Sequence, residues 1–93
     1  MTRDPAQPAT GSRQWLEAIN AGRHDATVGI VRYFAYDHLP VPLRSVSAAC
    51  AHLALDMIER LPDGPELTTG LRKLLKAKDC FVRTALDAPD ANA

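Results

Sequence analysis

One lysine lies among the apolar positions of the last amphipathic segment of the chain, where its charge needs a partner. At 100° per residue from Leu67, Lys78 projects near the centre of the apolar stripe formed by Leu71, Leu74, Leu75, Phe81, Val82 and Ala85. Burying an unpaired ammonium group costs several kcal/mol. Lys78 therefore predicts a carboxylate partner, a wet cleft between protomers, or an anionic ligand.

Further cations lie on the same predicted helix. Arg72, Lys76 and Arg83 project to one side of it, and Asp79 shares that side. Lys76 and Arg83 could ring an anion together with Lys78. The alternative is a solvated face on which Lys76 and Asp79 form an (i, i+3) pair.

Aromatic residues are concentrated just before the two longest predicted helices. Residues 32–38 read RYFAYDH, which contains both tyrosines and one of the two phenylalanines of the chain. Flat rings beside an arginine suit stacking on nucleobases, which is worth about 1–3 kcal/mol per base. Tyr33 and Tyr36 are the better ligand candidates because each has a polar tip, whereas Phe34 fits the hydrophobic core equally well.

The sequence contains no recognisable catalytic or metal-binding arrangement. It has no G-x-S-x-G, no H-E-x-x-H and no glycine-rich phosphate loop, so we expect neither an enzyme nor a cofactor. The adjacent His and Asp at 24–25 and at 37–38 supply too few ligands for a metal ion. Cys50 and Cys80 project in different directions, which predicts two free thiols.

Composition and charge limit the classes of partner. The chain has 93 residues, and eleven Lys and Arg balance eleven Asp and Glu. A neutral chain lacks the broad positive field that drives non-specific DNA or RNA binding. No apolar run resembles a signal peptide or a bilayer span, so we expect a soluble, cytoplasmic protein. A domain this small is marginally stable alone, which favours a homo-oligomer.

Apolar spacing predicts an all-α fold built on an antiparallel helical hairpin over residues 40–87. The seam of the first helix is formed by Leu43, Val46, Cys50, Leu53, Met57 and Leu61. The turn at 61–66 ends this helix, and Asp63 and Glu66 are placed to cap a second helix from about Pro65 to Leu86. So short a link makes the two helices antiparallel neighbours, and we expect oligomerisation through helix packing.

Residues 11–39 are expected to form a short helix and an extended aromatic arm. Ser12 can cap the helix and Gly22 can end it. The β-branched and aromatic run at 28–36 predicts extended backbone, which Pro40 and Pro42 end. The tails at 1–10 and 88–93 lack apolar periodicity and are expected to be disordered.

Residues 32–86 resemble a family of small phage proteins with a helical hairpin, the anti-CBASS and anti-Thoeris sponges. The resemblance rests on the aromatic entry RYFAYDH, the helix SAACAHLALDMIERLP, the turn PDGPE and the helix LRKLLKAKDCFVRTAL. Members of that group form symmetric oligomers, often hexamers. They bind cyclic di- or trinucleotides or ADP-ribose-derived signals of bacterial immunity between subunits without hydrolysing them.

The resemblance implies a cytoplasmic protein of the infected bacterial cell that sequesters a cyclic nucleotide second messenger. It places Tyr33, Phe34, Tyr36 and His38 on the stacking side of the site, and Lys78 with Arg72, Lys76 or Arg83 on the phosphate side. The alternative is a helical-bundle protein–protein interaction module with no small-molecule ligand. In that case Lys78 would pair with Asp56, Glu59 or a carboxylate of a partner.

Overall fold

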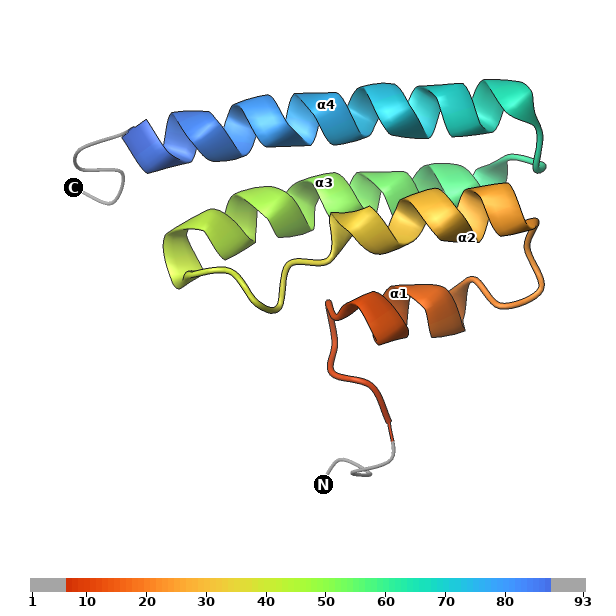
Figure 1. Ribbon diagram of the computed structural model, residues 1–93, viewed down its shortest axis with the longest axis horizontal. Helices are drawn as coiled ribbons and strands as arrows, with labels where there is room; N and C mark the ends of the chain where they lie inside the picture. Colours follow the sequence, from red (N-terminus) through yellow and green to blue (C-terminus); the bar gives the residue numbers. More distant parts are fainter. Residues whose placement is uncertain (1–6, 88–93) are drawn as a thin grey trace.

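The computed structural model describes residues 7–87, and all the regular secondary structure in this part of the chain is helical (Figure 1). In chain order the elements are α1 (Arg13–Ile19), α2 (Asp25–Val31), the 3₁₀ helix η1 (Arg32–Phe34), α3 (Val41–Arg60) and α4 (Pro65–Asp87). The all-α prediction is confirmed, and α3 and α4 lie side by side in opposite directions. Most of the two predicted tails lies outside the described residues; within 7–10, Ala9 accepts a 2.9 Å hydrogen bond from the Ser12 N–H.

The inward face of α3 differs from the predicted seam. Its buried residues are Leu43, Ser47, Cys50, Ala51, Ala54 and Ile58. Leu53 and Leu61, which the seam included, are 48% and 44% exposed. The reason is that α3 packs on α4, η1 and α2 together, and it turns its small alanines toward these neighbours so that they can approach closely.

The two cysteines lie where the sequence places them. Cys50 is buried, Cys80 is exposed, and both are free thiols. Burial raises the pKa of the Cys50 thiol, and the nearby Lys78 ammonium offsets part of that effect. Cys50 is therefore an uncharged core residue at neutral pH.

The N-terminal half begins as predicted and then departs from the expected arm. Ser12 Oγ accepts the Trp15 N–H at 3.0 Å and caps α1. The expectation of an extended arm is wrong over most of its length, because residues 25–31 form α2 and residues 32–34 form η1. Helical geometry buries Val31 and Phe34 completely, so tertiary packing overrides the strand propensity of this β-branched run.

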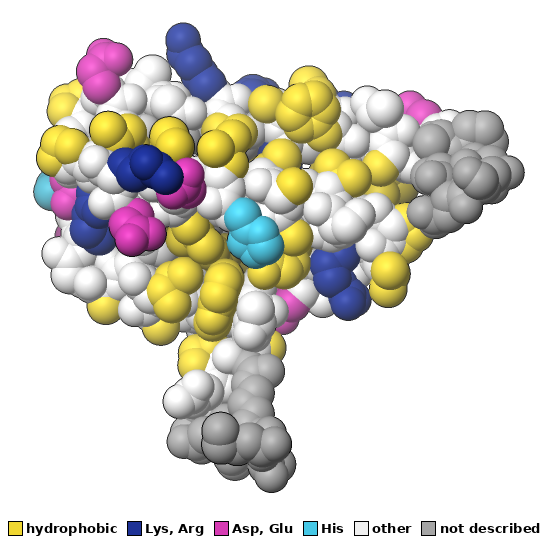
Figure 2. Space-filling view, turned by 180° about the vertical axis from the view of Figure 1, so that it is seen from behind, with side chains coloured by type: hydrophobic (Ala, Val, Ile, Leu, Met, Phe, Trp, Pro, Cys, Tyr) yellow, Lys and Arg dark blue, Asp and Glu magenta, His cyan; other side chains and the backbone are white. Residues whose placement is uncertain are grey.

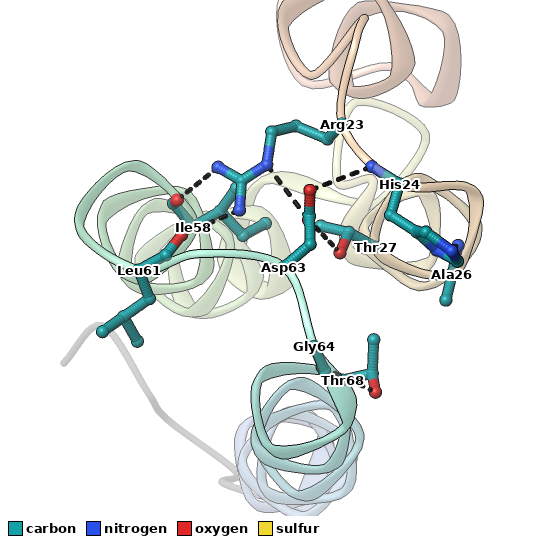
Figure 3. A network of polar contacts seen from close by, with 9 residues as sticks. All are labelled: Arg23, His24, Ala26, Thr27, Ile58, Leu61, Asp63, Gly64 and Thr68. Atoms are coloured by element: carbon teal, nitrogen blue, oxygen red, sulfur yellow. Dashed lines mark hydrogen bonds and ion pairs between the residues drawn. The ribbon is translucent and has the colours of Figure 1, made fainter.

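Asp63 binds the start of α2 instead of capping α4 (Figure 3). Its carboxylate accepts the Thr27 hydroxyl at 2.7 Å, the His24 backbone N–H at 3.1 Å and the Arg23 Nε–H at 3.0 Å. Glu66, the other predicted capping residue, is exposed in the first turn of α4. The turn between the two long helices is thus tied to the turn that precedes α2.

Arg23 completes this junction by capping the end of α3. Its guanidinium donates to the carbonyl oxygens of Ile58 at 2.6 Å and Leu61 at 2.8 Å (Figure 3). The last carbonyl groups of a helix have no partner within the helix, so these bonds satisfy groups that would otherwise need water. We call Arg23, His24, Thr27 and Asp63 the clasp.

Replacing Asp63 by Asn should destabilise the fold in a pH-dependent way. The hydrogen bond from Thr27, followed by those from His24 and Arg23, lowers the pKa of Asp63 from its ordinary value of 3.8. A carboxyl whose pKa is lower in the folded state contributes stability above its unfolded pKa and loses it as the pH falls through the folded pKa. We therefore expect a melting temperature several degrees lower at neutral pH, with the difference from wild type shrinking below pH 3.8.

Thermal melts followed by circular dichroism, from neutral pH to below pH 3.8, measure the difference in melting temperature. Asp56→Asn is the control, because Asp56 pairs with Arg60 at 2.9 Å on the exposed side of α3 and touches no other element through that bond. An equal loss of stability in the two variants would contradict the role given to the clasp.

None of the described helices combines the length and the apolarity that crossing a bilayer requires.

Candidate functional site

The aromatic segment and the last helix meet at a cavity of about 620 Å³, a size typical of small-molecule sites. Three parts of the chain form its walls: the start of α1, residues 32–39, and the C-terminal half of α4. Its lining includes four cationic residues, Arg13, Arg32, Lys78 and Arg83, and two carboxylates, Asp37 and Asp79. His38 also lines it. Four cations against two carboxylates make this cavity suited to an anion.

Lys78 lies on the α4 wall with its side chain only 14% exposed. Its Nζ donates to the backbone oxygen of Tyr33 at 3.0 Å and lies 6.0 Å from the centroid of the Phe34 ring. The Asp79 carboxylate is 3.8 Å away, too far for a hydrogen bond. An ammonium has three donors. Two of them therefore have no hydrogen-bond partner among the described residues and are free for a ligand.

Tyr33 forms the aromatic part of the wall and is half exposed. Two guanidinium groups lie near its ring, with Arg13 Cζ at 5.6 Å and Arg32 Cζ at 5.3 Å from the centroid. The Arg32 Nη1 atom also lies 4.0 Å from Glu17 Oε2, and the Arg32 Nε atom is buried without a hydrogen-bond partner in the described part of the chain. A flat ligand that reaches Tyr33 would therefore meet a ring already flanked by cations.

A junction at Gly11 brings the first two walls together. The backbone N–H groups of Tyr36 and Asp37 both donate to the Gly11 carbonyl, at 2.9 and 3.3 Å. Gly11 has a φ of +84°, a conformation that glycine adopts without strain. The Tyr36 ring packs against it so closely that a Cβ there would lie 2.5 Å from the Tyr36 Cε2 atom. This contact holds residues 11–14 beside residues 35–39.

Four of the predicted ligand residues line the cavity and four do not. Those that line it are Tyr33, His38, Lys78 and Arg83. Phe34 and Tyr36 are buried in the core, and the Tyr36 ring makes a T-shaped contact with the His52 ring, with the two centroids 6.0 Å apart. Arg72 and Lys76 are exposed on α4 outside the cavity.

The axial position of Lys76 explains why it lies outside the cavity. Lys76 is seven residues before Arg83, so it projects in nearly the same direction, but it lies roughly 10 Å nearer the start of the helix. Arg72 is one turn further away. The helical projection predicted the correct side of α4 but carried no information on which turns face residues 32–39.

Four charged cavity residues were not predicted as ligand residues: Arg13, Arg32, Asp37 and Asp79. The only signal for Arg13 was its place directly after the helix cap Ser12. Its contact with Tyr33 spans twenty positions of the chain and depends on how α1 packs against η1. Asp37 was considered only as half of a weak metal pair.

Comparison of the chain with protein-family models, with curated proteins and with solved structures finds no match in any of the three. The site must therefore be judged on its own chemistry. Within residues 7–87, no group of three or more His, Cys, Asp or Glu side chains is placed to hold a metal ion. What the cavity offers is cationic donors, an exposed phenol ring and two carboxylate acceptors, a combination suited to binding a nucleotide.

Proposed function

We propose that the protein is a non-enzymatic sponge that binds cyclic oligonucleotide or ADP-ribose-derived immune signals and so blocks bacterial anti-phage defence. Such signals combine phosphates with flat bases, and the cavity combines four cations with Tyr33. The observation that carries the proposal is the largely buried Lys78 ammonium, which binds the Tyr33 backbone oxygen and has two further donors without a partner among residues 7–87. Each charge-assisted hydrogen bond is worth about 1.5–3 kcal/mol, so a few of them give tight binding without any bond being broken.

Isothermal titration calorimetry with a panel of cyclic di- and trinucleotides and ADP-ribose isomers tests the proposal. We expect at least one member to bind and to be recovered intact from the complex by chromatography. If a folded sample binds no member of the panel, the sponge function is wrong. If a member is recovered as a cleaved product, the protein is an enzyme.

We also propose that the sponge is a homo-oligomer closed into a ring such as a hexamer. Hydrophobic side chains gather along α3 and α4 on the face shown in Figure 2. Between these helices lies an apolar groove of about 320 Å³, lined mainly by Leu53, Met57, Leu61, Leu67, Leu71 and Leu74. A small domain gains stability by covering such a surface with a second copy.

Leu53→Glu should dissociate the oligomer while leaving the subunit folded. Leu53 is about half exposed, so the change costs little within one subunit. Burying a leucine is worth about 1.5–3 kcal/mol, so we expect self-association to weaken by about 10- to 100-fold at each interface. Native mass spectrometry of freshly purified protein measures the subunit number and any co-purified anion.

Ile19→Glu is the matched control for this change. Ile19 is also half exposed but lies on α1, outside the groove. We expect it to keep the wild-type subunit number. A monomeric wild type, or a Leu53→Glu variant that remains fully assembled, would show that the groove is not a subunit contact.

The second candidate function is a helical-bundle interaction module without a small-molecule ligand, which the same apolar groove favours. Neither of its expected intramolecular ion pairs is formed: Asp56 binds Arg60, Glu59 is exposed, and within residues 7–87 the carboxylate paired with Lys78 is that of Asp79. This module would assemble normally and bind no member of the nucleotide panel.

A further inference from the structure

Asp37 is a carboxylate that an anion-binding cavity does not need. Its side chain is 36% exposed, and its Oδ1 lies 3.8 Å from His38 Nδ1, beyond hydrogen-bond range. Its backbone N–H donates to Gly11 at 3.3 Å, which fixes its position in the wall. Within residues 7–87 its carboxylate accepts no hydrogen bond from another side chain. Both oxygens are thus available to a ligand.

The second carboxylate of the cavity has a simpler explanation. Asp79 follows Lys78 on α4 and lies 3.8 Å from its ammonium, so it offsets the charge of that lysine. Asp37 lies instead on the segment after Tyr33, and its contacts with Gly11 and His38 involve no α4 cation. An ionised carboxylate only accepts hydrogen bonds, so a ligand that reaches Asp37 must offer N–H or O–H donors there.

Guanine is the nucleobase whose edge suits a carboxylate best. Its N1–H and N2–H groups are adjacent, parallel donors that can meet the two carboxylate oxygens together. The corresponding edge of adenine offers one amino donor beside the N1 lone pair, which a carboxylate repels. Ribose hydroxyl groups are also donors, but they are identical in guanine and adenine nucleotides.

We propose that Asp37 selects a guanine-containing signal by accepting hydrogen bonds from the guanine edge, while Lys78 and Arg83 hold phosphate. The inference rests on the proposed nucleotide-binding function and specifies its ligand class. Tyr33 lines the same cavity, with Arg13 and Arg32 near its ring, and would contact the face of the base.

Calorimetry with cyclic di-GMP and cyclic di-AMP tests this selection, because the two compounds have the same sugar–phosphate ring and the same net charge. A bidentate contact to a base edge discriminates enough to make cyclic di-GMP bind about 5- to 150-fold more tightly. Asp37→Asn replaces one acceptor by a donor. This variant should bind the two compounds with affinities within about threefold of each other.

Asp79→Asn is the matched control, since it removes the same charge from the same cavity. It should raise the affinity for both compounds and keep the preference for cyclic di-GMP. Three outcomes would overturn the role of Asp37 and leave the sponge function standing. The wild type could bind the two compounds equally, Asp79→Asn could lose the preference in place of Asp37→Asn, or a guanine-free member of the panel could bind more tightly. Failure of every nucleotide to bind would overturn both. The wild-type comparison needs no variant, so the inference stays testable even if Asp37→Asn folds poorly.

Discussion

Replacing Lys78 by methionine should reduce the affinity for the proposed nucleotide ligand by about 10- to 100-fold, because one or more charge-assisted hydrogen bonds worth about 1.5–3 kcal/mol are lost. Methionine keeps the length and the apolar stem of the side chain, so it still covers the Phe34 ring beneath. The fold loses the hydrogen bond from Nζ to the Tyr33 oxygen but no longer holds a largely desolvated cation. These effects oppose each other, so we expect stability within about 1 kcal/mol of wild type.

The measurement is calorimetry with the tightest member of the nucleotide panel, alongside thermal melts of the same samples. Lys73→Met is the matched control, because Lys73 is exposed on the same helix and lies outside the cavity. Both variants lose one positive charge, so a general field effect would lower both affinities alike. If Lys78→Met binds as wild type does, the cavity is not the binding site. If it unfolds while Lys73→Met does not, Lys78 is a structural residue.

The long hairpin was predictable because its signals are local. Apolar residues three and four apart define α3 and α4, and the Pro-Asp-Gly-Pro turn separates them. The orientation of α3 was less predictable. Alanine carries a weak apolar signal, so the larger Leu53 and Leu61 drew the expected seam away from Ala51 and Ala54, which the structure buries.

The parts that the sequence did not predict depend on contacts between distant residues. Val31 and Phe34 have strand-like propensities, yet they become helical because burial against α3 and α4 outweighs a preference worth about 1 kcal/mol. Asp63 has the sequence context of a helix cap, but its partners at 23–27 reach it only after the chain has folded. The helical projection placed Lys78 on the apolar face of the last helix, but it could not predict the partner atom, the Tyr33 backbone oxygen.

Gly11→Ala should be strongly destabilising, although Gly11 lies outside the central core. Two costs add at this position. A side chain at a φ of +84° costs about 1–2 kcal/mol for an L-amino acid. The added methyl would also lie 2.5 Å from the Tyr36 ring, which is buried and cannot move aside without disturbing its neighbours, and such overpacking costs about 1–3 kcal/mol.

The damage should extend to the candidate site, because Gly11 joins two of its walls. Its carbonyl accepts the N–H groups of Tyr36 and Asp37, and Ser12 and Arg13 follow it directly into the cavity. A shift of this junction moves Arg13 relative to Tyr33 and moves Asp37 relative to α4. We therefore expect loss of about 2–5 kcal/mol of stability, together with weaker nucleotide binding at temperatures where the variant is still folded.

Denaturant unfolding measures the first effect, and two other glycines separate its causes. Gly22 has a φ of +93° with no atom near its added Cβ, so Gly22→Ala should show the backbone cost alone, about 1–2 kcal/mol. Gly29 lies inside α2 with free space around it, so Gly29→Ala should stabilise the protein by about 0.5–1 kcal/mol. If Gly11→Ala cost no more than Gly22→Ala, the Tyr36 ring would be free to move and the junction would not be the rigid element that positions the cavity walls. A loss well beyond Gly22→Ala, with Gly29→Ala gaining stability, would locate the excess in the contact between Gly11 and Tyr36.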